Sequence, residues 1–257
     1  VTFFDDITFQ ANANLDVDLQ DDDAPVGVDS VEINGGAHVA LSGTGTAVVK
    51  ASRFVKVGSG GSLVTANGDL TVEANQQAPA NTGNFSGVTV DKGQLQATGT
   101  GNVTVKGKGG TGGFFHGVLV DGVNAKIASG SGNVSVTGIA VGSAGSFANI
   151  GVFVNGSAVI SAGANGTVSV TGFGGTAANQ DFSSGVALGS GGSITSTNGN
   201  IMVTGTGGGT GAGCDKNYGV GVGNGSQISS SGNGAVTVIG TGGSAPAGND
   251  NVGVYVA

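Results

Sequence analysis

The chain has few of the residues that build a broad globular core. Among its 257 residues there is no tryptophan, and there are two tyrosines, three prolines and one cysteine. The single cysteine, Cys214, excludes a disulfide framework within the chain. Whether Cys214 forms a bond to another chain stays open at this point. Because large aromatic side chains are scarce, any core must be narrow and built from β-branched residues and alanine.

Charged residues are also scarce, at 9% of the chain, and the formal net charge is -8. A protein that binds nucleic acid through its phosphates needs clustered lysine and arginine. The group most similar to such a cluster is Lys50, Arg53 and Lys56, and three cations of this kind are typical of a solvated surface. We therefore expect no nucleic-acid partner. No long apolar run is present, so this segment is not expected to insert into a membrane.

Glycine, by contrast, is abundant, with 55 residues, and it recurs at a fixed spacing. Units of the form Gly-Val-x-Leu/Val begin 34 residues apart, at Gly117, Gly151, Gly185, Gly219 and Gly253. Each period also holds a second unit, such as Val168-Ser-Val-Thr-Gly172. Apolar residues in these units lie two apart, whereas a helical repeat would place them three and four apart. The pattern predicts a β repeat array with one coil per period.

The period 151–184 predicts the course of one coil. Short strands are expected at 151–154, 158–161 and 168–171, joined by turns rich in Gly and Asn, and a loop over 172–184 leads to the next coil. Successive coils would stack with parallel strands in register. The predicted fold is all-β, a right-handed parallel β-helix (β-solenoid) with about 34 residues and three short strands per coil.

Stacking in register predicts columns of inward side chains. The residues predicted to form this structural core are Val118, Val120, Val152, Val154, Val186, Leu188, Val220, Val222, Val254 and Val256. The positions between them point outward, and Leu119, Phe153 and Tyr255 are a possible contact surface for loops of the same chain or for a neighbouring rod.

Asparagine recurs just before the second unit of each period. The positions are Asn67, Asn102, Asn133, Asn165, Asn200 and Asn233. We expect a left-handed backbone at these corners and hydrogen bonds to the equivalent residues of adjacent coils.

The first 30 residues differ from the array predicted at 31–257. They hold eight aspartates and the alternating segment Leu15-Asp-Val-Asp-Leu19, so we expect an acidic, strand-rich lead-in or cap at 1–30. Oxygen ligands for Ca²⁺ could come from Asp16, Asp18, Asp21, Asp22 and Asp23. Their spacing matches no calcium-binding motif, and a solvated acidic face is the alternative.

At the other end, Gly253-Val-Tyr-Val-Ala257 starts a further coil. An uncovered last coil would leave strand edges free to pair. We therefore expect the array to continue beyond the C-terminus, in the same polypeptide or across a contact.

Few residues could carry catalysis. Between 127 and 257 the charged residues are Asp181, Asp215, Lys216 and Asp250, all in loops, whereas acid/base catalysis needs converging groups. His38 and His116 also lack neighbours at metal-ligand spacing. We expect no catalytic residue, no cofactor and no enzyme activity, with a polysaccharide-active β-helix enzyme as the weaker alternative.

Blocks such as Gly199-Asn-Ile-Met-Val-Thr-Gly-Thr-Gly-Gly-Gly209, followed by Gly219-Val-Gly-Val222, resemble the β-solenoid repeats of filamentous haemagglutinin-like bacterial adhesins and related giant surface proteins. The resemblance covers about residues 55–257 and identifies no receptor. It implies a non-catalytic, extracellular structural or adhesive segment of a large bacterial surface or secreted protein.

Two kinds of partner follow as expectations. One is other copies or further repeats, through end-to-end or lateral contact, and the other is surface glycans of a host or the environment. The alternative function is a self-assembling segment of an extracellular fibre, sheath or surface layer.

Overall fold

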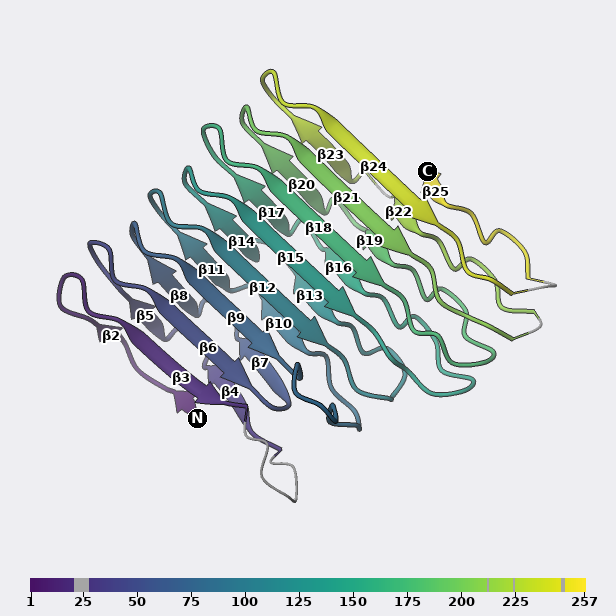
Figure 1. The fold of residues 1–257 in the computed structure, drawn as a ribbon, viewed down its shortest axis with the longest axis horizontal. Coiled ribbons are helices and arrows are strands. Elements are labelled where there is room, and N and C mark those ends of the chain that lie inside the picture. Colours follow the sequence, from purple (N-terminus) through teal and green to yellow (C-terminus); the bar gives the residue numbers. More distant parts are fainter. Residues whose placement is uncertain (21–27, 212, 224, 246–247) are drawn as a thin grey trace.

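The computed structural model describes residues 1–20, 28–211, 213–223, 225–245 and 248–257, and these residues contain strands and no helix. The strands form three parallel sheets, and consecutive strands of the chain belong to consecutive sheets (Figure 1). Each coil therefore gives one strand to each sheet. Along the nearer sheet of Figure 1 the chain runs from upper left to lower right, while the coils advance from left to right, so the winding is right-handed. The predicted β-solenoid is confirmed.

We name the sheets A, B and C in the order in which the chain first enters them. Sheet A contains β1 (Thr2–Phe3), β4 (Ser30–Ile33), β7 (Phe54–Val57), β10 (Val88–Asp91), β13 (Val118–Asp121), β16 (Val152–Asn155), β19 (Val186–Leu188), β22 (Val220–Val222) and β25 (Val254–Val256). Sheet B contains β2 (Ile7–Thr8), β5 (His38–Ala40), β8 (Ser62–Thr65), β11 (Gln94–Ala97), β14 (Lys126–Ser129), β17 (Val159–Ala162), β20 (Ser193–Ser196) and β23 (Gln227–Ser230). Sheet C contains β3 (Leu15–Leu19), β6 (Ala47–Ala51), β9 (Leu70–Ala74), β12 (Val103–Lys108), β15 (Val134–Ile139), β18 (Val168–Phe173), β21 (Ile201–Thr206) and β24 (Val236–Thr241).

The core is a narrow stack of aliphatic side chains in register. Val152 pairs with Val118 on one side and with Val186 on the other. The predicted core residues that are fully or almost fully buried are Val118, Val120, Val152, Val154, Val186, Leu188 and Val220. Val222 is half-buried. The prediction is wrong for Val254 and Val256, which are 45% and 72% exposed because no described coil lies over β25.

The predicted asparagine corners are partly right. The side-chain oxygens of Asn102, Asn133 and Asn200 each accept a hydrogen bond, of 2.9 Å, from a backbone N–H one coil further on. The left-handed backbone expected there is absent: the positive φ angles fall at other asparagines, such as Asn75 and Asn124. The physical reason is that Asn102, Asn133 and Asn200 lead directly into an extended strand.

The aspartate-rich start of the chain follows the same pattern as the coils. β1, β2 and β3 pair in parallel with β4, β5 and β6, so residues 1–20 contribute the first strand to every sheet. Leu15, Val17 and Leu19 pack against the core, while the two aspartates between them are exposed.

A pair of glycines closes the base of each long loop between sheet C and sheet A from β12 onward. A Cβ atom on Gly172 would overlap the carbonyl oxygen of Gly185, and a Cβ on Gly138 would overlap that of Gly151. The same contact recurs in the neighbouring coils. Glycine is required because the two backbones touch where the chain leaves sheet C and returns to sheet A. The two glycine units of each period therefore meet in space.

Candidate interaction surfaces

The long loops stack on one another and form a ridge along the solenoid (Figure 1). We call the described residues of 109–117, 140–151, 174–185, 207–219 and 242–253 the loop ridge. Backbone hydrogen bonds join its layers: Ala148 N–H donates to the carbonyl of Asp181, and Phe182 N–H donates to that of Asp215. The loops therefore continue the coil-to-coil pairing of the sheets, and their side chains are held at fixed spacing.

Buried amide side chains hold the interior of the loop ridge. The Asn217 side chain accepts a hydrogen bond from Ser183 N–H at 2.7 Å and donates one to the carbonyl of Gln180 at 2.9 Å. The Gln180 side chain donates to the carbonyl of Ser143. Cys214 lies fully buried in the same interior, so a bond to another chain would require the ridge to open.

The outer edge of the loop ridge carries exposed phenylalanines. The ring centroids of Phe114 and Phe147 are 5.4 Å apart, and those of Phe147 and Phe182 are 4.8 Å apart. These side chains are 64%, 39% and 38% exposed. The Lys216 ammonium lies 5.3 Å from the Phe182 ring. We call these three rings the aromatic strip; exposed apolar groups in a row are typical of a contact surface.

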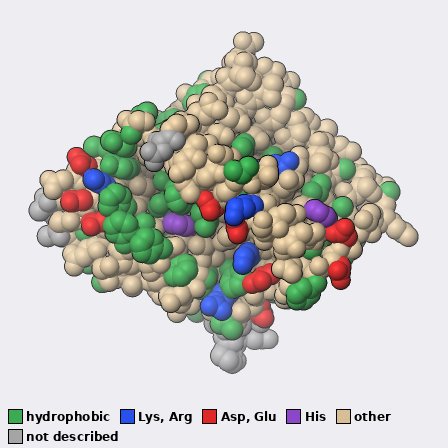
Figure 2. All heavy atoms as spheres, turned by 180° about the vertical axis from the view of Figure 1, so that it is seen from behind, with side chains coloured by type: hydrophobic (Ala, Val, Ile, Leu, Met, Phe, Trp, Pro, Cys, Tyr) green, Lys and Arg blue, Asp and Glu red, His purple; other side chains and the backbone are tan. Residues whose placement is uncertain are grey.

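A second aromatic surface lies on the outer face of sheet A. It is a hollow of about 290 Å³, lined by Ile150, Phe153, Asn155, Phe182, Ser184, Ala187, Leu188, Gly189, Ser190, Tyr218, Gly221, Gly223 and Tyr255. We call it the aromatic groove. Figure 2 shows hydrophobic side chains gathered on this side of the molecule, in the half that holds the C-terminal coils (left). None of the described residues that line the groove is charged.

The groove partly matches the predicted contact surface. Phe153 and Tyr255 both line it, whereas Leu119 pairs with Phe153 one coil earlier and stays outside the lining. The sequence did not predict the hollow between the large residues. The feature of the sequence that indicates the hollow is the pair of small residues, Ala187 and Gly221, which separate Phe153 from Tyr255 in the outward column.

The two tyrosines of the groove act together. Their rings are stacked, with centroids 4.6 Å apart and an interplanar angle of 7°. Burial raises the pKa of the Tyr218 hydroxyl, and the nearby Tyr255 and Asp250 raise it further. The hydroxyl therefore stays protonated at neutral pH and can donate a hydrogen bond.

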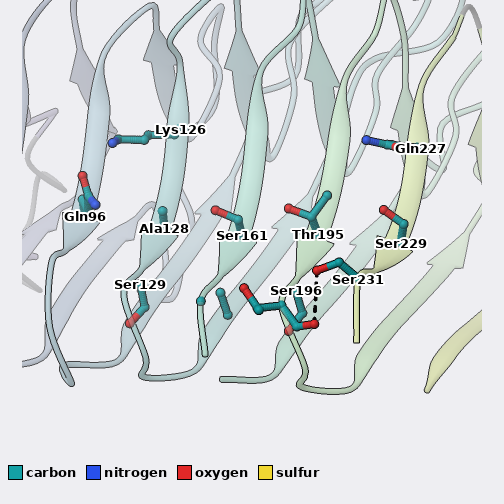
Figure 3. Close-up of a pocket in the computed structure, with 13 residues that line it drawn as sticks. Gln96, Lys126, Ala128, Ser129, Ser161, Thr195, Ser196, Gln227, Ser229 and Ser231 are labelled. Atoms are coloured by element: carbon teal, nitrogen blue, oxygen red, sulfur yellow. Dashed lines mark hydrogen bonds between the residues drawn. The ribbon is translucent and has the colours of Figure 1, made fainter. Parts of the chain in front are cut away.

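A wider, polar groove of about 530 Å³ crosses sheet B (Figure 3). Ser161, Thr195 and Ser229 line up across neighbouring strands, with Lys126 and Gln227 to one side. The hydroxyls at the strand ends have structural partners. For example, the Ser196 hydroxyl donates to a backbone carbonyl at 2.9 Å.

The aspartates considered for Ca²⁺ are only partly described. Asp16 and Asp18 project from β3, and the Asp18 carboxylate lies 3.1 Å from the Lys50 ammonium. Asp21, Asp22 and Asp23 lie outside the described residues. Within the described ranges, no group of three or more His, Cys, Asp or Glu side chains could hold a metal ion. The calcium site stays a prediction.

The two histidines lie in different surroundings. The Nδ1 atom of His38 lies 2.9 Å from the Ser62 hydroxyl, and the His38 side chain is exposed. His116 is buried, with its Nδ1 accepting a hydrogen bond of 3.3 Å from Ile150 N–H and its ring against Phe153. Burial lowers the pKa of His116 to about 4, so the ring is neutral at neutral pH.

The loop carboxylates bind backbone. The Asp181 side chain accepts a hydrogen bond of 2.8 Å from Asp215 N–H, and the Asp215 side chain accepts one of 2.6 Å from Asn249 N–H. They therefore stack in one column of the loop ridge, each joined to the next layer.

The apolar interior is open at the last described coil. Val222, Ile228, Val236, Val238, Val254 and Val256 surround a hollow of about 330 Å³ together with two polar side chains. A further coil of the same kind would cover these side chains.

Searches against protein-family models, curated proteins and solved structures give no match to this chain. Among the described residues, no helix has the length and apolar character needed to cross a membrane.

Proposed function

We propose that this chain is a non-catalytic structural and adhesive segment of a large bacterial surface or secreted protein, placed outside the cell. The observation that carries the proposal is the position of the aromatic side chains. The aromatic strip and the aromatic groove lie at the loop ridge and on the adjacent face of sheet A, in layers held by coil-to-coil hydrogen bonds. Such a surface suits binding by contact.

The rest of the molecule supports a mechanical role. Stacked parallel strands around a buried aliphatic core form a quasi-one-dimensional rod, in which each coil contacts its neighbours. Few charged side chains interrupt the later coils. The proposed division of work is that the sheets provide length and stiffness while the ridge and groove provide the contact.

Attachment of cells provides the test. Strains with and without the parent protein would be compared on host-cell layers and on abiotic surfaces, and antibody labelling of intact cells would locate the segment. We expect surface labelling and reduced attachment in the deletion strain. Unchanged attachment together with an intracellular location would contradict the proposal.

The open apolar hollow favours a second candidate function, which is self-assembly into a fibre, sheath or surface layer. Its occupant would be a coil of another copy, which would bury Val254 and Val256. Electron microscopy of the purified chain at high concentration tests this. Filaments with a continuous cross-β spacing would support self-assembly, and discrete rods under all conditions would count against it.

A further inference from the structure

The aromatic groove arises because two small residues lie between large ones on the outer face of sheet A. In the outward column, Phe153 is followed by Ala187 and Gly221, one coil apart each, and then by Tyr255. Beside this column, the small residue Ser184 occupies the position in its coil that Tyr218 occupies in the next coil. The coil of β19 therefore presents small side chains between aromatic neighbours, and a notch forms over Ala187.

Glycine backbones seat the aromatic rings that bound the notch. A Cβ atom at Gly221 would lie 3.2 Å from Cδ2 of Tyr218, and one at Gly189 would lie 3.4 Å from Cε2 of Phe153. Both rings therefore pack on bare backbone. Tyr218 is also stacked on Tyr255, which restricts its rotation. The aromatic surfaces are preorganised, which lowers the entropy cost of binding.

The width of the notch suits one saturated six-membered ring. Phe153 and Tyr218 belong to coils two apart, which corresponds to about 10 Å along the solenoid. Such a distance is too large for direct stacking of the two side chains and leaves room for a ring between them.

The lining also combines apolar faces with neutral hydrogen-bonding groups. Asn155, Ser184, Ser190 and the two tyrosine hydroxyls provide donors and acceptors, and the Asn155 amide is oriented by a 2.7 Å hydrogen bond to Asp121. A purely apolar guest would leave these groups without partners. A charged guest would meet no opposite charge in the described lining. A sugar has both an apolar C–H face and neutral hydroxyls.

We propose that the aromatic groove binds an uncharged saccharide unit of a surface glycan, with its C–H face against Tyr218 or Phe153. The sugar hydroxyls would exchange hydrogen bonds with Asn155, Ser190 and the tyrosines. This inference rests on the proposed adhesive function, for which it supplies the ligand class.

The chain contains its own reporter for this site. It has two tyrosines and no tryptophan, and both tyrosines line the groove. Tyrosine fluorescence therefore reports on the groove directly. The purified chain would be titrated with cellotetraose, xylotetraose, maltotetraose and chitotetraose, with tetragalacturonate and a leucine-rich peptide as charged and apolar comparisons. We expect a saturable change with at least one neutral sugar at about millimolar concentration or below.

Two variants place the binding in the groove. Ala187→Leu fills the notch, and Tyr218→Ala removes one aromatic face; each should weaken binding at least tenfold. Thr171→Leu, an outward substitution on sheet C, and Phe114→Ala, on the aromatic strip, are the matched controls and should leave affinity unchanged. Circular dichroism and thermal melting would establish that each variant is folded.

Three results would overturn the inference. They are no response to any neutral sugar, binding of the charged or apolar probe instead, and sugar binding that survives Ala187→Leu in a folded protein. The attachment experiment separates this failure from that of the proposed function. If cells carrying Ala187→Leu attach like wild type while the deletion strain does not, adhesion stands and the groove is not its site.

Discussion

At the scale of single residues, the paired glycines at the base of the long loops are tightly constrained positions. We predict that Gly172→Ala lowers stability by about 1–3 kcal/mol, because its Cβ would overlap the carbonyl oxygen of Gly185 and two stacked backbones would have to separate. Gly223→Ala is the matched control, since a Cβ there would meet no atom within 4 Å. Urea unfolding of both variants checks this, and equal midpoints would show that the contact carries no constraint.

His116 gives the chain a pH-dependent stability. Its pKa is about 4 in the folded protein and near 6.5 when unfolded, so the unfolded chain binds the extra proton between these values. The stability that depends on neutral His116 is therefore fully present above pH 6.5, and it is lost as the pH falls towards 4. The loss is about 3 kcal/mol for the full shift.

Urea midpoints between pH 7 and pH 4 provide the measurement for His116. His116→Gln should lose this part of the pH dependence, although acid titration of carboxylates will remain below it. His38→Gln, at an exposed position, is the comparison variant for the loss of a histidine elsewhere in the chain. Identical profiles for wild type and His116→Gln would contradict the prediction.

The sequence predicts single residues well where spacing decides their position. Val152 and Val154 were predicted to be buried because they recur every 34 residues, and the register pairs them as expected. Backbone angles were predicted less well. The asparagine corners have the expected hydrogen bonds without a left-handed backbone, since the same side chain can cap a coil from an extended residue.

At the scale of elements, sheet C carries a column of alternating charge on its outer face. Asp18, Lys50, Glu73 and Lys106 occupy the same position in successive coils. The ammonium of Lys50 lies 3.1 Å from Asp18, and that of Lys106 lies 2.8 Å from Glu73. Opposite charges on adjacent strands favour this register, and like charges would oppose it.

Reversing one charge tests the column. Lys50→Glu places an acid between Asp18 and Glu73, and we expect a loss of about 1 kcal/mol at low ionic strength that shrinks in high salt. Thr171→Glu introduces the same group where both neighbours in the column are threonine, so it should cost little. Thermal melting in low and high salt measures both. A salt-independent difference would rule out an electrostatic origin.

The strands themselves were predictable, and the groove was not. In the period 151–184 the predicted strands differ from β16, β17 and β18 by one or two residues at their ends, because turns of Gly and Asn mark the boundaries. The hollow depends on how the Tyr218 ring, which enters from a loop, lies over Gly221. Side-chain direction in a loop has no periodic signal.

At the scale of the whole molecule, stability should vary along the rod. The inward valines of β15 and β18 are fully buried between neighbouring coils, whereas Val238 of β24 is half-buried. We predict that amide hydrogen exchange is slowest in the central coils and fastest in β24 and β25, because local opening at an uncovered coil breaks fewer contacts. Equal protection of β24 and β18 at high concentration would instead indicate that another copy covers the hollow.

The overall architecture could be predicted from the sequence because the same weak local pattern recurs in successive periods. One Val-x-Val segment is ambiguous, but six recurring asparagines and five glycine units in phase admit few folds. The function is less accessible, since the surfaces that could bind a partner are those that vary from coil to coil. Phe153, Ala187, Gly221 and Tyr255 occupy one equivalent position and differ in size.

The equal spacing of the paired glycines at the base of the long loops has a consequence for how the length of the rod can change. Gly151 and Gly185 sit at equivalent positions, so excision of residues 152–185 would join Gly151 to Val186, the same pair of residue types as Gly151 and Val152. The backbone on both sides of such a junction already has the geometry that the new neighbour requires. Loss or gain of one whole period can thus shorten or lengthen the rod by a coil while the backbone pairing at the junction is kept.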